Sequence, residues 1–232
     1  MGELTSNRPK CLVEIREGET ILGRQLRVLQ RFGLEDILIT TGPFEEKIRD
    51  YAAARPEKLQ VSLINNPAYE ETNYIYSLVL AGEKMGDKMP EEIILLHGDL
   101  VFDAAVVEKL LSDGNKNAVL TNPYTSLPEK DFKAELENGL VKRIGVDVFG
   151  ANCSFLIPFY KLSGKAFRAW LEEMERFRER GDLKVYAENA LNNLLPGLEL
   201  HPVELKDEFC MEIDDREDLE KAKSYFTGGG EG

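Results

Sequence analysis

The stretch Glu91-Glu-Ile-Ile-Leu-Leu-His-Gly-Asp-Leu-Val-Phe-Asp103 decides the fold of this chain. Its apolar run, Ile93 to Leu96, includes two β-branched residues between polar flanks, which is typical of a strand buried on both faces of a parallel sheet. Gly98 then permits a tight turn or a close approach by a ligand. Asp99 adds a carboxylate just past the carboxyl end of the strand, where open α/β sheets bind their ligands. The stretch therefore predicts an α/β domain with a binding site at Asp99.

Strands and helices alternate on the N-terminal side of this stretch. Apolar residues from Leu22 to Phe32 recur at helical spacing, and Gly33 suits the residue that follows a helix. Beyond it we expect a strand at 36–41, a helix from Phe44 to Tyr51, a strand at 59–64 and a helix at 75–84. This alternation predicts a doubly wound, mostly parallel, Rossmann-like sheet with helices on both faces and right-handed crossovers.

The pattern changes after a helix at 105–111 and a strand at 118–121. Asn138-Gly139 lies between the strand-like runs 132–136 and 140–144, which is a strong hairpin signal and predicts a small antiparallel elaboration. The remaining expected elements are a strand at 152–157, an amphipathic helix at 160–180, a helix at 185–195, strands at 198–205 and 210–214, and a final helix entered through Asp215.

We predict one domain over residues 1–226. Its nucleotide-binding part covers about 1–121, its acceptor-binding elaboration covers about 122–210, and a disordered tail covers 227–232.

The composition restricts the class of partner. A net charge of −13 over 232 residues opposes a broad phosphate-tracking surface, so we expect neither nucleic acid nor an anionic membrane as a partner. The three cysteines are far apart in the sequence, which suggests neither a disulfide framework nor a zinc site. No apolar run approaches the roughly 20 residues of a membrane span, and no signal peptide is seen. We expect a cytoplasmic protein.

Three charged residues could carry chemistry, and each has a simpler explanation. Asp99 could have the structural role of starting a turn and no chemical role. Asp214 lies in an acidic cluster in which Asp215 and Asp218 have the spacing of a capping box at a helix start. Lys10, after Pro9, could be a solvated surface lysine. None of the three is decisive alone.

Together they resemble a known superfamily. Leu4-Thr-Ser-Asn-Arg-Pro-Lys-Cys-Leu12 resembles the second half of the signature of nucleotidyltransferases that join an NTP to a phosphorylated small molecule, and Gly98-Asp99 resembles their metal-binding strand end. Asn66 to Leu78, and Glu212-Ile-Asp214 with Asp218 to Ala222, are similar to the phosphocholine cytidylyltransferase branch, and the aminoethylphosphonate cytidylyltransferases look related. The resemblance extends from about Leu4 to Phe226.

The resemblance implies a magnesium-dependent transfer of CMP from CTP. Asp99 and Asp214 would hold Mg²⁺, a hard cation that prefers oxygen ligands. Lys10 would face the charge that develops on the α-phosphate. A phosphate or phosphonate oxygen of the acceptor would attack the α-phosphorus in line, and pyrophosphate would leave.

The resemblance also suggests where the nucleotide and the acceptor bind. Thr72, Asn73 and Ser77, with Gly98, would contact the nucleotide, although Thr72 or Asn73 as a helix N-cap is an equally good local explanation. The candidates for the acceptor are Asp131, Lys133, Asp147 and Glu188. A quaternary ammonium group would want aromatic faces, for which the candidates are Tyr124, Phe149, Tyr186 and Phe209, unless these pack in the core.

The first part of the superfamily pattern is not found before Leu4 to Leu12 in this sequence. The pattern begins with an apolar strand and a glycine-rich loop whose amides cradle the nucleotide phosphates. We expect Met1 to be an internal methionine, with the natural start roughly 15–20 residues earlier, the length of a strand and a loop. Without those elements we expect weak nucleotide affinity and little activity.

Two other functions stay open. The acceptor could be a sugar 1-phosphate on the same fold, although Asn73-Tyr-Ile-Tyr-Ser-Leu78 and the modest length favour the first function. The chain could also be a catalytically inactive protein that uses the nucleotide fold to bind a ligand or partner.

Overall fold

The structure is a computed structural model that describes residues 2–55 and 59–229. The chain divides into two compact units. The first unit comprises Met1–Asn65, His97–Lys109 and Asp207–Gly232, and the second comprises Asn66–Leu96 and Leu110–Lys206. The α4 helix, Ala104–Ser112, begins in the first unit and ends in the second.

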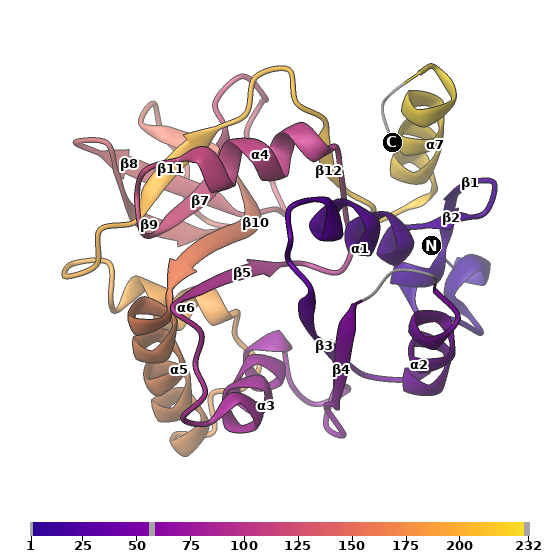
Figure 1. Ribbon diagram of the computed structural model, residues 1–232. Coiled ribbons are helices and arrows are strands. Elements are labelled where there is room, and N and C mark those ends of the chain that lie inside the picture. Colours follow the sequence, from indigo (N-terminus) through magenta and orange to yellow (C-terminus); the bar gives the residue numbers. More distant parts are fainter. Residues whose placement is uncertain (1, 56–58, 230–232) are drawn as a thin grey trace. The chain divides into compact units, whose positions relative to one another are not determined.

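The first unit contains three two-stranded sheets among its described residues (Figure 1). The pairs are β1 with β2, β3 with β4 in parallel, and β6 with β12 in antiparallel orientation. Its elements are 3₁₀ helices at Gly2–Thr5 and Lys10–Leu12, β1 Glu14–Arg16, β2 Glu19–Thr20, α1 Ile21–Arg31, β3 Asp36–Thr41, α2 Glu45–Ala53, β4 Gln60–Asn65, β6 Leu100–Phe102, β12 Cys210–Glu212 and α7 Arg216–Thr227.

Local sequence explains the βα part of the first unit. Thr20 caps α1 by accepting a hydrogen bond from the Gly23 amide, and Gly33 follows the helix with a positive φ of 74° that favours glycine. The predicted strand at 36–41 is confirmed as β3. Two apolar clusters bury the faces of these elements. One gathers Val13, Ile15, Ile21, Val101, Ile213, Leu219, Ala222 and Phe226, and the other Leu12, Leu22, Leu26 and Ile48.

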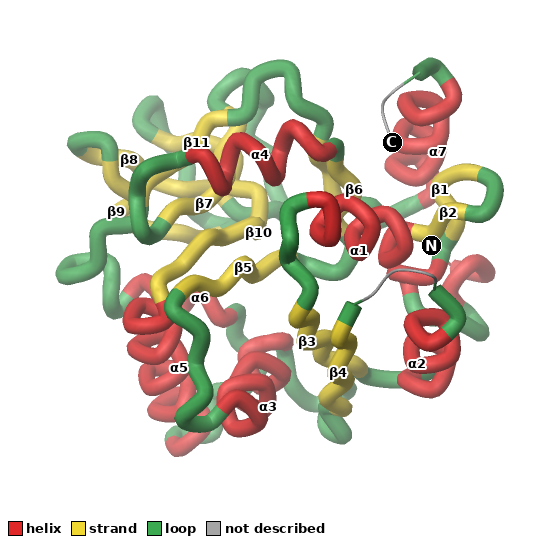
Figure 2. Tube along the Cα trace, viewed as in Figure 1, coloured by secondary structure: helices red, strands yellow, loops and turns green. Residues whose placement is uncertain are grey.

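The second unit is built on a six-stranded sheet with the order β11-β7-β10-β8-β9, and β5 also pairs with β10 (Figure 2). β11 and β7 are parallel, whereas β10 is antiparallel to β5, β7 and β8. Four strands, β5, β7, β8 and β11, therefore run in one direction. The elements are α3 Tyr74–Met85, β5 Glu92–Leu96, β7 Ala118–Asn122, β8 Lys133–Glu137, β9 Leu140–Gly145, β10 Cys153–Ser163, α5 Gly164–Glu179, α6 Ala187–Asn192 and β11 His201–Glu204.

The α3, α5 and α6 helices pack side by side, and α5 and α6 contact strands of this sheet (Figure 1). Trp170 of α5 is fully buried at their junction, and its indole N–H donates to the Ala187 carbonyl oxygen at 2.9 Å. A buried Trp needs such a partner, because an unpaired polar N–H in the core costs free energy. The amphipathic face predicted for this helix is confirmed.

The predicted α/β class is confirmed, and so is the hairpin: Asn138 and Gly139 have φ values of 53° and 74° between β8 and β9. The burial of one strand differs from the prediction. Ile93 to Leu96 in β5 are only half-buried, whereas all three residues of β6 are buried. The apolar run marks a strand correctly, but the sequence does not show how many faces are covered.

The boundary between β10 and α5 also differs. The helix predicted from Tyr160 begins at Gly164, because residues up to Ser163 extend β10 and pair with β5. The helix predicted at 185–195 is limited to α6.

At the C-terminus, Thr227 is the last residue of α7, and residues 230–232 of the predicted tail lie outside the described residues. No helix in the described parts of the chain is long and apolar enough to cross a membrane.

Candidate active site

The pairing of β6 with β12 brings two distant carboxylates together in the first unit. Asp99 precedes β6 directly, and Asp214 follows β12 after one residue. In the antiparallel register Glu212 lies opposite Leu100. The Ile213 amide then donates to the Asp99 carbonyl oxygen at 3.1 Å. Asp99 and Asp214, which are 115 positions apart in the sequence, therefore lie on adjacent backbone segments.

Lys10 joins the two carboxylates. It opens a 3₁₀ helix for which Pro9 is the N-cap residue. Its Nζ donates to Asp99 Oδ2 at 2.9 Å and to Asp214 Oδ1 at 2.8 Å. These two oxygens are no farther apart than the sum of those distances. The structure thus brings together the three residues for which catalytic roles are predicted.

The carboxylates keep Lys10 charged. Burial of its ammonium opposes the charged form, but the charges and hydrogen bonds of Asp99 and Asp214 outweigh it, so the pKa of Lys10 is raised. Asp99 and Asp214 use two of the three N–H donors of the ammonium. The third remains available for a ligand oxygen.

The donor atoms around Asp99 suit a hard divalent cation. Asp99 Oδ1 is buried and accepts no hydrogen bond from any residue that the structure describes. A ligand atom of Glu212 and one of His97 lie within 4.8 Å of an Asp99 oxygen and of each other. Glu212 and Asp214 likewise have carboxylate oxygens within 4.8 Å of each other. The oxygens of Asp99, Asp214 and Glu212 are the ligands that Mg²⁺ prefers.

Asp214 and Asp215 have different partners. Asp215 and Asp218 form the capping box of α7: Asp215 accepts from the Asp218 amide at 3.0 Å, and Asp218 accepts from the Asp215 amide at 3.3 Å. Asp218 also accepts from the Asp214 amide at 3.1 Å. The Asp214 carboxylate takes no part in this box and bonds to Lys10 instead. The capping explanation therefore applies to Asp215 rather than to the Asp214 side chain.

Two residues of α1 hold the backbone before and after β6, and one of them holds the turn at Asp99. Gln25 Nε2 donates to the carbonyl oxygens of His97 at 3.0 Å and Leu100 at 2.8 Å. Arg24, fully buried, donates to the Phe102 carbonyl at 2.7 Å and to Asp103 Oδ1 at 2.6 Å. Neither residue was predicted as part of the site. The sequence does offer one signal for them. Arg24 and Gln25 are two adjacent polar residues between Leu22 and Leu26, in a part of α1 whose other residues are buried.

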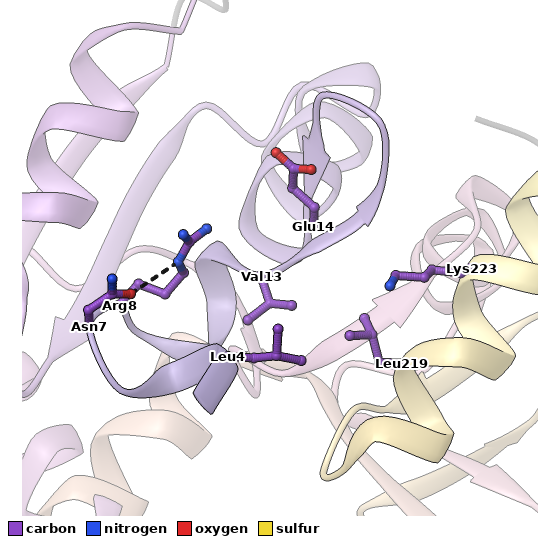
Figure 3. A pocket seen from close by; sticks show the side chains of 7 residues that line it. All are labelled: Leu4, Asn7, Arg8, Val13, Glu14, Leu219 and Lys223. Carbon is purple, nitrogen blue, oxygen red and sulfur yellow. Dashed lines mark hydrogen bonds between the residues drawn. The ribbon is translucent and has the colours of Figure 1, made fainter. Parts of the chain in front are cut away.

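Two pockets adjoin the segment that carries Lys10. The larger, about 540 Å³, is lined by Leu4, Asn7, Arg8, Val13, Glu14, Leu219 and Lys223. Arg8 lies on one side and Lys223 on the other, with the three apolar side chains between them (Figure 3). The smaller pocket, about 310 Å³, also contains Arg8 and extends to α2. Both belong entirely to the first unit.

Gly98, predicted to contact the nucleotide, precedes Asp99 in the turn. Its φ is not positive, and a Cβ added there would meet no protein atom within 4 Å. The fold of the chain therefore does not itself require glycine at this position.

The predicted base-binding residues lie at the start of α3 in the second unit. Asn73 is the N-cap residue, and its Oδ1 accepts from the Tyr74 amide at 2.7 Å. Asn66, which is buried, donates to the hydroxyls of Thr72 and Ser77 at 3.1 Å each. Asn66 orients the two hydroxyls and was not predicted. Contact of these residues with a base stays a prediction.

The four predicted acceptor residues of the second unit differ in their surroundings. Glu188 is buried, accepts from Tyr160 at 2.9 Å and also accepts from Tyr74. Lys133 is buried too, and its ammonium donates to the carbonyl oxygens of Pro128 and Val146. Burial lowers the pKa of Lys133, although nearby Asp131 and Asp147 oppose this.

Asp147 is exposed and pairs with Arg143 at 2.7 Å, and Asp131 is half-buried. The roles of all four residues toward an acceptor stay predictions.

Three of the four predicted aromatic candidates are exposed in the second unit: Tyr124, Phe149 and Tyr186. Tyr186 packs edge-on against Phe132, with ring centroids 5.0 Å apart. Phe209 belongs to the first unit and stacks on Tyr225 with a centroid separation of 3.8 Å. Phe209 therefore packs in the core, the alternative that was left open.

Comparison with known proteins gives a family for this arrangement. Residues 1–186 match the family described as "MobA-like NTP transferase domain". The chain belongs to this family. The predicted resemblance to the nucleotidyltransferase superfamily is therefore confirmed.

Two curated relatives of this MobA-like chain carry names that describe synthases or transferases. CMP-5'-(3-aminopropyl)phosphonate synthase of Streptomyces rubellomurinus is 31% identical over 119 residues, which are 51% of this chain and 18% of the relative. The bifunctional IPC transferase and DIPP synthase of Aquifex aeolicus is 25% identical over 225 residues, which are 97% of this chain and 48% of the relative. The chain thus matches less than half the length of either relative.

Solved structures agree on the fold. CTP:phosphocholine cytidylyltransferase from Streptococcus pneumoniae has a TM-score of 0.75 at 18% identity, covering 97% of this chain and 93% of that one. The inositol-1-phosphate CTP transferase from T. maritima has a TM-score of 0.75 at 16% identity, covering 99% and 91%. At these identities the likeness concerns the fold alone.

Proposed function

We propose that this MobA-like domain transfers CMP from CTP to a phosphate or phosphonate oxygen of a small acceptor that carries an amino or quaternary ammonium group, and releases pyrophosphate. The observation that carries the proposal is the Lys10 ammonium held between the carboxylates of Asp99 and Asp214. Family membership supports nucleotidyl transfer in general. The name of the S. rubellomurinus relative, a CMP-aminopropylphosphonate synthase, favours CTP and an aminoalkylphosphonate.

The reaction needs positioning and neutralisation of charge rather than a covalent enzyme intermediate. An acceptor oxygen forms a bond to the α-phosphorus of CTP. The bond from that phosphorus to the oxygen bridging to the β-phosphate breaks, and pyrophosphate leaves with the electron pair. Lys10 donates its third N–H to an α-phosphate oxygen, where negative charge builds up.

Asp99, Asp214 and Glu212 are the residues that would hold Mg²⁺, because their oxygens converge and Asp99 Oδ1 is buried without a hydrogen-bond partner among the described residues. A bound Mg²⁺ would supply positive charge and a fixed orientation for phosphate oxygens. The charge of Lys10 would add to the positive charge that the ion supplies. The turn held by Gln25 fixes where Asp99 presents its oxygens.

The second unit supplies candidate groups for an amino acceptor. Glu188 is a buried carboxylate with two tyrosine donors, and Tyr186, two residues earlier, is half-exposed. A carboxylate and aromatic faces are the groups that recognise an ammonium ion. We propose that Glu188 and Tyr186 favour an acceptor with a cationic nitrogen over a sugar phosphate, whose sugar carries no positive charge.

The proposal is tested by release of pyrophosphate from each of CTP, UTP, ATP and GTP in the presence of Mg²⁺. The acceptors are aminoethylphosphonate, aminopropylphosphonate, phosphocholine, inositol 1-phosphate and glucose 1-phosphate. We expect CTP with an aminoalkylphosphonate or phosphocholine to give the highest kcat/KM. Turnover with glucose 1-phosphate alone would replace this acceptor class with sugar 1-phosphates. In a protein that also carries the first strand and glycine-rich loop of the superfamily pattern, no turnover with any pair would contradict the proposal.

A further inference from the structure

The smaller pocket, which adjoins the segment that carries Lys10, has an unusual set of charges. Asn7, Arg8, Leu12, Glu14, Thr20, Lys47 and Tyr51 line its volume of about 310 Å³. Arg8 and Lys47 are exposed, and neither has a carboxylate partner within 4.0 Å among the described residues. This is notable in a chain with 42 acidic and 29 basic residues. Two cations therefore share one concave surface, and neither forms an ion pair with a described residue.

The two cations come from separate elements and are held near each other. Arg8 directly precedes Pro9 and Lys10. Lys47 lies on α2, and its Nζ donates to the Asn7 backbone carbonyl oxygen. That bond directs the Lys47 ammonium to the segment that carries Arg8. The ammonium keeps further N–H donors for a ligand.

A hydroxyl adds a third donor to this pocket. Tyr51 accepts hydrogen bonds from the Thr20 hydroxyl at 2.9 Å and from the Arg55 guanidinium at 2.8 Å. Thr20 is fixed in turn, because it accepts from the Gly23 amide at 3.0 Å. With both incoming bonds in place, the Tyr51 O–H is left to donate. Arg8, Lys47 and Tyr51 thus offer donors to an anion.

We propose that Arg8 and Lys47 bind the pyrophosphate part of the nucleotide, its β- and γ-phosphates. This deepens the proposed function and rests on it. Arg8 is two residues from Lys10, a distance that the chain spans in at most roughly 7 Å. Lys10 faces the α-phosphate, so cations on the neighbouring segment lie within reach of the next phosphates. A guanidinium fits phosphate oxygens with two parallel hydrogen bonds, and an ammonium acts as a point charge.

One acidic residue of the pocket opposes this ligand. Glu14 lines both pockets and is exposed. Its carboxylate repels a polyanion, so a variant of Glu14 should change the affinity for pyrophosphate in the opposite direction to a variant of Arg8. Removing Glu14's charge should strengthen binding of the same anion that loss of Arg8's charge weakens.

The test is titration calorimetry of the purified protein with inorganic pyrophosphate. We expect Arg8→Ala and Lys47→Ala each to weaken pyrophosphate binding about 10-fold, the size of a lost charge-assisted hydrogen bond. Arg8→Lys and Lys47→Arg should restore most of it, and Glu14→Gln should strengthen it. Lys221→Ala is the matched control, because it removes one positive charge from α7 outside the pocket. Unchanged melting temperatures show that the variants fold.

Two outcomes would overturn the inference: no pyrophosphate binding by the wild type, or equal affinity in the wild type and both alanine variants. The same titration separates this inference from the proposed function. Pyrophosphate bound through Arg8 and Lys47, in a protein that transfers nothing from CTP to any acceptor, would support the pocket and contradict the transfer of CMP.

Discussion

The central feature at the residue scale is one ammonium shared by two carboxylates. Lys10 lies within 3 Å of Asp99 and Asp214 oxygens, and all three side chains keep some access to solvent. In a structural ion pair one carboxylate would be enough to neutralise the lysine. The second carboxylate leaves the cluster with a net negative charge, which suits a divalent cation.

Gln25 is expected to act as a positioning residue. Replacing it by leucine (Gln25→Leu) removes both bonds to the His97 and Leu100 carbonyl oxygens and leaves these acceptors unpaired. The free energy of unfolding should fall by about 1–3 kcal/mol, and kcat should fall more than KM changes, because the Asp99 turn loosens. Urea unfolding and steady-state kinetics measure the two effects.

Gln30→Leu is the matched control for Gln25→Leu. Gln30 lies on the same helix, and its side chain makes no hydrogen bond to any residue that the structure describes. Gln30→Leu should leave kcat and stability near those of the wild type. Equal losses in both variants would mean that Gln25 has no special role.

The sequence predicted the residues at the centre of the site better than the residues that surround them. Lys10, Asp99 and Asp214 carry recognisable motifs, so the sequence alone suggests that they meet. Gln25 lies at the same helical spacing as the apolar residues of α1, so the sequence indicates only that it belongs to the buried face of a helix. Its partners are backbone carbonyls 72 and 75 positions away, which no local pattern can reveal.

At the scale of elements, local signals were sufficient where a single segment decides its own structure. The strand 36–41 and the Asn138-Gly139 hairpin were predicted from turn chemistry and alternation. β10 was predicted six residues shorter at its C-terminal end, because its last residues are strand through pairing with β5 and β7. Partners far away in the sequence decide such boundaries.

The capping box of α7 should contribute stability but not catalysis. Asp215→Ala removes the side chain that accepts from the Asp218 amide at 3.0 Å. We expect the free energy of unfolding to fall by about 1 kcal/mol, within the usual range for a lost N-cap. Chemical denaturation measures this loss. A variant as stable as the wild type would show that the box contributes nothing.

Glu173 of α5 should make the second unit sensitive to acid. The hydrogen bond from Asn193 at 2.8 Å lowers the pKa of its carboxyl, burial opposes this, and Arg176 at 2.6 Å lowers the pKa further. A lowered native pKa means that the ionised group stabilises the fold above the ordinary pKa of glutamate, about 4.3. This contribution is lost as the pH falls through the lowered native value.

Glu173→Gln should therefore be less stable than the wild type by about 1–3 kcal/mol at pH 7, and the difference should shrink below about pH 4. Thermal melting across this pH range measures it. Glu172→Gln, at the exposed neighbouring position, is the control and should show no such dependence. A difference that does not vary with pH would rule out the ionised Glu173 as its cause.

At the scale of the whole molecule, the charge of −13 must be reconciled with a polyanionic substrate. We propose that Lys10, Arg8 and Lys47 supply part of the positive charge that the substrate needs and that Mg²⁺ supplies the rest. Chelation by EDTA should abolish pyrophosphate release from CTP, and excess Mg²⁺ should restore it. The melting temperature should change little, because Lys10 still pairs with Asp99 and Asp214. Full turnover in EDTA would exclude the metal.

The most direct test of the central claim compares two neighbouring carboxylates. It measures the initial rate of pyrophosphate release from CTP and an aminoalkylphosphonate, with saturating Mg²⁺, for Asp214→Asn and Asp215→Ala. Asp214 bonds to Lys10, whereas Asp215 caps α7. We predict that Asp214→Asn loses about 100-fold or more in rate, the scale of a lost electrostatic group at a reacting centre, while Asp215→Ala keeps the wild-type rate. A wild-type rate in Asp214→Asn would contradict the account.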